Sequence, residues 1–220
     1  MSIAVFDCDA VLFDMDGTLV DSRGIVERMW TFWATENGLP VEAALAVAHG
    51  RRTLETMQLL APHLATPEAA ARLDALEAEQ EGGETAMPGA FDLLSALPAD
   101  RWALVTSAGR VLASQRMASV GLPVPAVLIG ADDVSAGKPS PEGYLRAAER
   151  LGVEARRCVV IEDTPAGVEA GRSAGASVIG LQTTYPTLEQ CHALVTELRA
   201  LRVESPADGW AIRLVIGPDG

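Results

Sequence analysis

Short apolar runs alternate with helical stretches over much of the chain, and this pattern is the first indication of the fold. Apolar runs of strand length occur at residues 10–13, 102–105, 126–129, 158–161 and 177–181. Stretches of helical length lie between them at residues 110–120, 142–151 and 165–174. Continuous short apolar runs are typical of strands that are buried on both faces. The alternation from about residue 98 to residue 181 therefore predicts a parallel sheet with helices on both faces.

The segment from about residue 23 to residue 85 does not follow this alternation. Its apolar residues recur at helical spacing among many Ala and Glu residues, and it contains no β-branched run of strand length. One predicted helix, residues 65–81, begins with Thr66-Pro67, a capping hydroxyl before a first-turn proline, and ends at Gly82-Gly83. We expect several helices here, inserted after the first strand.

The two ends of this helical segment carry the predicted hinges, which we place near Ser22 and at residues 84–88. The prediction is an α/β protein whose core domain comprises residues 1–21 and 86–220, with residues 22–85 inserted as an all-helical cap domain. Near the end of the chain, residues 201–204 and 210–215 flank a Pro-Ala-Asp-Gly turn, which predicts a terminal hairpin.

Composition and charge exclude several classes of partner. The chain has 220 residues, 49% of them hydrophobic, so it can bury a sizeable core, yet no apolar run reaches membrane-spanning length. The net charge of −13 argues against nucleic acids and anionic membranes, because both favour clustered Lys and Arg. An anionic substrate would therefore need a cation and aimed hydrogen-bond donors at the site itself.

The cysteines and the first residues indicate the compartment. Cys8, Cys158 and Cys191 show no CxxC spacing, which fits a reducing environment. The N-terminal apolar stretch carries four aspartates and no basic leader, so it does not have the pattern of a secretion signal. We expect a cytoplasmic protein that is a monomer or a weak homodimer.

Polar residues follow four of the five predicted strands. They are Asp14-Met15-Asp16-Gly17-Thr18, Thr106-Ser107, Lys138-Pro139 and Glu162-Asp163. In open parallel sheets, ligands bind beyond the carboxyl ends of the strands, so these side chains are expected to share a site. Carboxylates from two strand ends can hold Mg²⁺, while a lysine and hydroxyls can cradle phosphate.

Asp14 and Asp16 have the spacing for two different roles. With a metal and Lys138 neutralising the substrate, the Asp14 carboxylate could attack phosphorus and form a covalent intermediate. Asp16, two residues further along an extended segment, could protonate the leaving oxygen and later deprotonate water. A second pair, Asp7 and Asp9, is not followed by a Gly-Thr turn, and we expect it to lie outside the site.

Four motifs in order carry a resemblance to a known family. They are FDMDGTLVDS at 13–22, VTSA at 105–108, GKPSPE at 137–142 and VIEDTPAGVEAG at 160–171. With them the chain resembles the haloacid dehalogenase superfamily, in its phosphatase branch with an inserted helical cap, which implies a Rossmann-like core. The resemblance implies that Asp14 is the nucleophile and Asp16 the general acid/base, and that Thr106, Ser107 and Lys138 bind phosphate. It also implies that Mg²⁺ is held by the Asp14 side chain, the Asp16 carbonyl and Asp163, with Glu162 close by.

The cap segment narrows the expected substrate. ERMWTFWATENGL at 27–39 and AHGRRT at 48–53 are similar to bacterial sugar and hexitol phosphate phosphatases and to fungal glycerol phosphate phosphatases. This similarity implies a small sugar or polyol monophosphate. His49, Arg51 and Arg52 could bind its hydroxyls or phosphate, and Trp30 or Trp33 could form an apolar wall.

Other functions stay open at this point. A β-phosphoglucomutase-like phosphomutase is one, although related mutases carry His twelve residues after the nucleophile and this chain has Val26 there. A phosphoglycolate-type phosphatase is another. A metal-free dehalogenase would leave Asp16 without a task, and a phospho-accepting signalling module is usually smaller and has no inserted helices.

Overall fold

A six-stranded parallel sheet forms the centre of the computed structural model, which describes residues 4–79, 82–207 and 209–217. The strand order is β6-β5-β2-β7-β8-β9, and every neighbouring pair is parallel. This confirms the predicted α/β class. The strands are β2 (Ala10–Phe13), β5 (Trp102–Val105), β6 (Leu128–Ile129), β7 (Cys158–Glu162), β8 (Ser177–Leu181) and β9 (Ala193–Val195).

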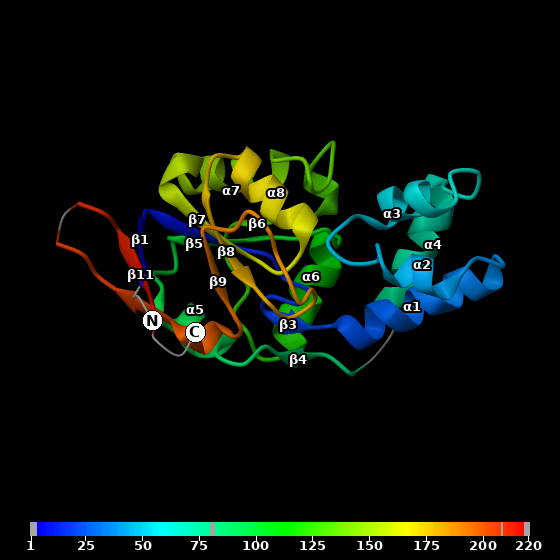
Figure 1. The fold of residues 1–220 in the computed structure, drawn as a ribbon, viewed down its shortest axis with the longest axis horizontal. Coiled ribbons are helices and arrows are strands. Elements are labelled where there is room, and N and C mark those ends of the chain that lie inside the picture. The colour runs from blue at the N-terminus through cyan, green and yellow to red at the C-terminus, as the bar shows by residue number, and fades with distance from the viewer. Residues whose placement is uncertain (1–3, 80–81, 208, 218–220) are drawn as a thin grey trace.

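Helices cover both faces of this sheet because its strands are apolar on both sides. Val11 and Phe13 of β2 pack with α5 (Ala90–Ala96) and α6 (Arg110–Ser119), whereas Ala10 and Leu12 pack with α7 (Glu142–Leu151) and α8 (Pro165–Ser173). Figure 1 shows α7 and α8 above the sheet and α5 below it. Single 3₁₀ turns lie at η1 (Ala131–Asp133), η2 (Ala155–Arg157) and η3 (Leu198–Ala200).

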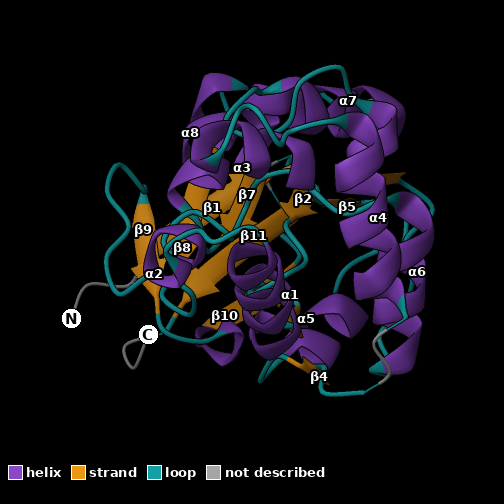
Figure 2. Ribbon diagram, turned by 90° about the vertical axis from the view of Figure 1, so that its right-hand side faces the viewer, coloured by secondary structure: helices purple, strands orange, loops and turns teal. Residues whose placement is uncertain are grey.

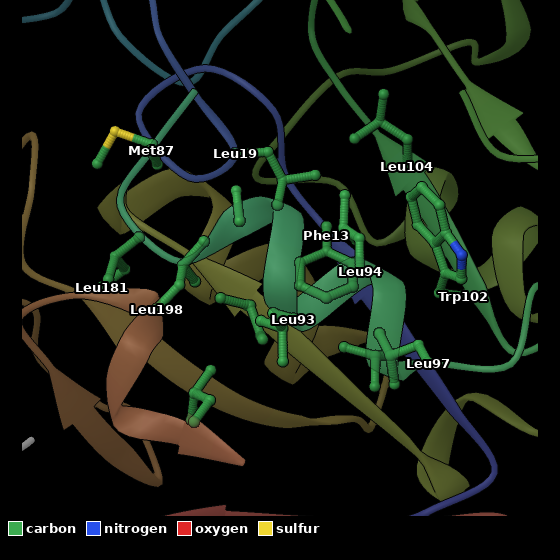
Figure 3. Packing of buried hydrophobic residues seen from close by; sticks show 14 of the residues in the cluster. Phe13, Leu19, Met87, Leu93, Leu94, Leu97, Trp102, Leu104, Leu181 and Leu198 are labelled. Atoms are coloured by element: carbon green, nitrogen blue, oxygen red, sulfur yellow. The ribbon is translucent and has the colours of Figure 1, made fainter. Parts of the chain in front are cut away.

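The lower layer of the core is built around aromatic and leucine side chains. Leu94 of α5 lies beside Phe13, and Leu97 lies near Trp102 (Figure 3). The rings of Phe13 and Trp102 meet edge to face, with centroids 6.0 Å apart and an interplanar angle of 84°. Burying one side chain of this kind contributes about 1.5–3 kcal/mol, so this layer fixes β2 and the loop that follows it.

The segment expected to be helical contains α1 (Arg23–Glu36), α2 (Val41–Leu45), α3 (Thr53–Leu60) and α4 (Pro67–Ala78). These helices have an apolar cluster of their own, whose buried members run from Ile25 to Leu73 and include Trp30 and Trp33, edge to face at 5.4 Å. Figure 1 shows the four helices gathered at one end of the molecule, the end that faces the viewer in Figure 2. None of the described helices has the length and apolar character of a membrane span.

The start of α4 agrees with the prediction from the sequence, but its end does not. The Thr66 hydroxyl accepts a hydrogen bond from the Ala69 N–H, and Pro67 occupies the first turn, as the capping pattern predicts. The helix ends at Ala78, and residues 80–81 of the predicted 65–81 lie outside the described residues. β3 (Val20–Asp21) and β4 (Thr85–Ala86) pair antiparallel, so the two connections to the sheet run side by side.

A second sheet joins the two ends of the chain. β1 (Ala4–Cys8) pairs with β11 (Ile212–Ile216), which also pairs with β10 (Leu201–Glu204), all antiparallel. The predicted hairpin is thus present, with Asp208 of its turn outside the described residues. Asp7 pairs with Arg213 (Nε–Oδ1 2.7 Å) and Asp9 with Arg157, so this aspartate pair has structural partners.

Candidate active site

Residues from the ends of adjacent strands meet at the carboxyl edge of the central sheet. Asp14 follows β2, and Glu162 ends the neighbouring β7. Lys138, in the loop before α7, reaches between them: its Nζ donates to Asp14 Oδ1 and to Glu162 Oε1, the latter at 2.7 Å. All three side chains are buried. The structure therefore brings together predicted residues from positions 14, 138 and 162.

Glu162 holds Lys138 in place rather than facing an open space. Its Oε1 also accepts from the Tyr144 hydroxyl at 3.2 Å, and its Oε2 accepts from the N–H groups of Asp163 and Thr164 at 2.8 and 2.9 Å. A Cβ at Gly167 would lie 1.6 Å from Glu162 Oε1, so only glycine leaves room for this carboxylate. Both Glu162 oxygens thus have donors.

Asp163 differs, because one of its oxygens has no donor. Oδ1 accepts from the Thr18 hydroxyl at 3.1 Å, but Oδ2 is buried and makes no hydrogen bond. Oδ2 lies against Gly17, whose φ is +86° and where an added Cβ would be 2.1 Å from that oxygen. The Thr184 hydroxyl borders the same glycine and interacts with the Asp163 carboxyl group, without making a hydrogen bond of ordinary geometry. An acceptor buried without a donor is costly unless a cation binds it.

Ion-pair electrostatics set the charges of this cluster. Burial alone lowers the pKa of Lys138, but the carboxylates of Asp14 and Glu162 raise it well above its ordinary value, so Lys138 is a cation at neutral pH. Burial raises the pKa of Asp14 to about 7, although the Lys138 ammonium acts to lower it. Burial and the charges of Asp14 and Glu162 raise the pKa of Asp163 well above its ordinary range.

Asp16 lies beside this cluster with different partners. Its Oδ1 accepts from the Ser22 hydroxyl at 2.6 Å and from Arg116 Nη1 at 2.8 Å. Arg116 belongs to α6 and is only 2% exposed. Its other amino group donates to Glu77 of α4 at 2.7 Å. Asp16 is therefore anchored by Ser22, which precedes α1, and by Arg116, which connects it to Glu77 of α4.

A cavity of about 660 Å³ opens between the carboxyl edge of the sheet and the helical segment. Asp14, Asp16, Thr106 and Ser107 line it from the sheet, and the Ser107 hydroxyl donates to the Gly50 carbonyl at 3.1 Å. From the helical segment it is lined by Val26, Trp30, His49, Arg51 and Arg52. Trp33 does not line this cavity; it packs inside the cluster of α1–α4.

The three candidate cap residues have different surroundings. Arg52 is bound by Glu55 at 2.5 Å and by the carbonyls of Val134 and Ser135, so it fastens α3 to the loop that leads to Lys138. Burial lowers the pKa of His49, which is therefore neutral at pH 7. Arg51 has no ion-pair partner among the described residues, which leaves its charge available to the cavity.

Comparison with known proteins gives the family. Residues 8–175 match the family model described as haloacid dehalogenase-like hydrolase. The chain belongs to the haloacid dehalogenase-like hydrolases. The predicted resemblance is thereby confirmed.

Relatives of this haloacid dehalogenase-like hydrolase cover most of its length. Hexitol phosphatase A of Escherichia coli is 39% identical over 212 residues, 93% of this chain and 98% of that protein. Glycerol-1-phosphate phosphohydrolase 2 of Saccharomyces cerevisiae is 36% identical over 190 residues, 80% of this chain and 76% of that protein. The crystal structure of a hydrolase from Pseudomonas syringae superposes with a TM-score of 0.77 at 26% identity, covering 87% of this chain and 94% of that one.

The acidic residues of this hydrolase fit a metal ion. Asp14, Glu162 and Asp163 each offer an oxygen within 4.8 Å of the others. Three acidic side chains face one ammonium, and Asp163 Oδ2 accepts no hydrogen bond of ordinary geometry, so the cluster offers oxygen ligands and an acceptor that a cation could bind. Hard cations such as Mg²⁺ and Ca²⁺ prefer such oxygen ligands.

Two residues of this site were absent from the sequence prediction. Tyr144 and Arg116 lie on α7 and α6, where their spacing marks an inward-facing helical position and nothing more. Their roles depend on contacts with Glu162, 18 residues away, and Asp16, 100 residues away. An inward position for a charged residue is the signal that could have identified Arg116.

Proposed function

We propose that this chain is a Mg²⁺-dependent phosphomonoesterase that acts on a small sugar or polyol phosphate through an aspartyl-phosphate on Asp14. The observation that carries the proposal is the meeting of Asp14, Lys138 and Asp163 beneath a cavity that is open to a small molecule. The names of the relatives, a hexitol phosphatase and a glycerol-1-phosphate phosphohydrolase, support the substrate class.

Each side chain has a task in the first half of the reaction. The Lys138 ammonium, with the hydroxyls of Thr106 and Ser107, offsets the charge of the phosphate and holds it. The Asp14 carboxylate attacks phosphorus, the bond between phosphorus and the ester oxygen breaks, and Asp16 gives that oxygen a proton. The alcohol leaves, and the phosphoryl group stays on Asp14.

The second half restores the enzyme. Asp16, now a carboxylate, takes a proton from a water molecule that attacks the phosphoryl phosphorus, and the bond to Asp14 breaks with release of inorganic phosphate. Mg²⁺, held by the Asp14 side chain, the Asp16 carbonyl and Asp163, with Glu162 close by, would supply positive charge beside the phosphate oxygens. Glu162 acts through Lys138, because its own oxygens are both occupied.

The helical segment is proposed to be the cap. Residues 22–85 would form the cap domain and residues 1–21 and 86–220 the core, with the paired β3 and β4 as the two connections. His49, Arg51 and Arg52 would face or support the substrate, and closure would exclude water from the reaction. Val26 lines the cavity where a mutase would need a His, which favours hydrolysis over phosphoryl return. A monomer or weak homodimer in the cytoplasm belongs to the same proposal.

A phosphate-release screen tests the function. The panel contains hexitol, hexose and glycerol phosphates and phosphoglycolate, with and without Mg²⁺, and Asp14→Asn is the matched control. We expect metal-dependent release from the sugar and polyol esters, and none from Asp14→Asn. Preference for phosphoglycolate would contradict the substrate class. Isomerisation without phosphate release would show a mutase, and no turnover of any ester would refute the proposal.

A further inference from the structure

Arg116 joins three segments that the reaction must coordinate. Its Nη1 donates to Asp16 Oδ1 at 2.8 Å, its Nη2 donates to Glu77 Oε1 at 2.7 Å, and its Nε lies 3.7 Å from Glu84 Oε1. Asp16 is in the loop after β2, Glu77 is on α4, and Glu84 is on the connection that leads back to the sheet. One guanidinium, 2% exposed, thus links the central sheet, the helical segment and its return strand.

The contact leaves Asp16 with two unequal oxygens. Oδ1 accepts from both Arg116 and Ser22, whereas no hydrogen bond from the residues that the structure describes reaches Oδ2. Asp16 also lines the cavity, and its side chain is 25% exposed. With Oδ1 anchored, the carboxyl group cannot turn freely, and Oδ2 is the oxygen that remains to exchange a proton with a ligand in the cavity.

Glu77 also affects the contact between Arg116 and Asp16, because it binds the other amino group of Arg116. A guanidinium is planar, with donors in a fixed fork, so the direction of Nη1 depends on what Nη2 binds. Glu77 lies on α4 with its side chain mostly buried, and it pairs with Arg116. When α4 lies as it does here, the fork is fixed at both ends. If α4 moves away, the Arg116 guanidinium no longer binds Glu77 and can change its orientation, so Asp16 loses a hydrogen-bond donor with a fixed direction.

We propose that Arg116 is a positioning residue that couples the docking of α4, through Glu77, to the orientation of the general acid Asp16. The inference rests on the proposed phosphatase function. It adds to that function a reason why Asp16 is correctly oriented only when α4 is docked against Arg116. Protonation of the leaving oxygen would then depend on closure, which limits reaction to a substrate enclosed in the cavity.

The leaving group separates this role from a merely structural one. An alkoxide, as in a polyol ester, needs a proton as it leaves, whereas p-nitrophenolate is a stable anion that leaves without one. The ratio of kcat/KM for glycerol 1-phosphate to kcat/KM for p-nitrophenyl phosphate therefore reports the positioning of Asp16. A loss of folded protein or of phosphate binding lowers both values equally and leaves the ratio unchanged.

Two variants and a control form the test. Glu77→Ala removes the α4 end of the link, and Arg116→Lys keeps the charge but replaces the fork by a single ammonium. Glu36→Ala is the control, because Glu36 is a cap carboxylate paired with an arginine, Arg72, at 3.3 Å, and has no contact with Asp16. Folding of each variant is checked by its thermal transition.

We expect both variants to lower the ratio at least about tenfold, a fraction of what general acid catalysis supplies, and Glu36→Ala to leave it unchanged. In an Asp16→Asn background, Glu77→Ala should cause no further fall in the ratio, because residues that act through one group are not additive. An unchanged ratio in folded Glu77→Ala and Arg116→Lys would overturn the coupling. Wild-type protein that cleaves neither ester would instead refute the proposed function.

Discussion

The raised pKa of Asp14 predicts an unusual pH dependence for the stability of the metal-free protein. The folded protein raises this pKa from its ordinary 3.8 to about 7, chiefly by burial. A carboxyl whose pKa is raised on folding favours the protonated form, so it stabilises the fold fully below pH 3.8 and loses that contribution as the pH rises to about 7. At about 1.4 kcal/mol for each pH unit, the full loss is about 4 kcal/mol.

Asp14→Asn removes this titration, and it also removes the negative charge that contributes to the raised pKa of Asp163. The linkage relation gives a loss of about 2 kcal/mol at pH 5 and about 4 kcal/mol at pH 8. Relative to wild type, the variant should therefore gain about 2–3 kcal/mol between these two pH values. Lys138 keeps Glu162 as a partner in the variant, so the remaining ion pair is not removed.

The assay is urea unfolding of wild type and Asp14→Asn in EDTA at pH 5 and pH 8, followed by tryptophan fluorescence and analysed by linear extrapolation. Added Mg²⁺ at pH 8 should stabilise wild type and should stabilise Asp14→Asn less, because the variant lacks one ligand. A difference in stability that does not change between pH 5 and pH 8 would refute the electrostatic reasoning. If Asp14→Asn is less stable relative to wild type at pH 8 than at pH 5, the sign of the effect is opposite to the prediction, which would refute the reasoning more strongly.

Further predictions concern packing and thiol chemistry. Gly167→Ala should lower the free energy of unfolding by at least about 2 kcal/mol in urea melts, because its Cβ would lie 1.6 Å from Glu162 Oε1; wild-type stability would contradict this close approach. Burial raises the pKa of Cys8 and of Cys158 to about 12 and also raises that of Cys191, which is less buried, so Cys191 should react with a thiol reagent before the other two in native protein. Equal rates for all three thiols, read from the labelled peptides, would contradict that order.

Much of the central sheet could be predicted because its strands are apolar on both faces. The runs at 102–105 and 177–181 coincide with β5 and β8, since each is bounded by polar or turn residues. β9 was missed because Leu194 is exposed and the strand has only three residues, so it shows no continuous apolar run. β1 was missed because its pairing with β11 joins distant ends of the chain.

The site could be predicted where the positions of residues just after the parallel strands determine which side chains meet. Residues that follow parallel strands meet at one edge, and Asp14 and Lys138 therefore come into contact. The partners of Arg116 and Arg52 were not predictable in this way. Arg52 lines the cavity, but its contacts with Glu55 and with two carbonyls of the loop before Lys138 were not expected. Helical spacing shows which way a residue faces but not which distant group it meets.

Trapping the covalent intermediate tests the central claim most directly. Asp16→Asn with p-nitrophenyl phosphate and Mg²⁺ should form the aspartyl-phosphate, because this leaving group needs no acid, and should hydrolyse it slowly, because the base is missing. After an acid quench, mass spectrometry of peptides should find close to one phosphate per chain, on Asp14. A burst of p-nitrophenolate without protein-bound phosphate, or phosphate on another residue, would contradict nucleophilic attack by Asp14.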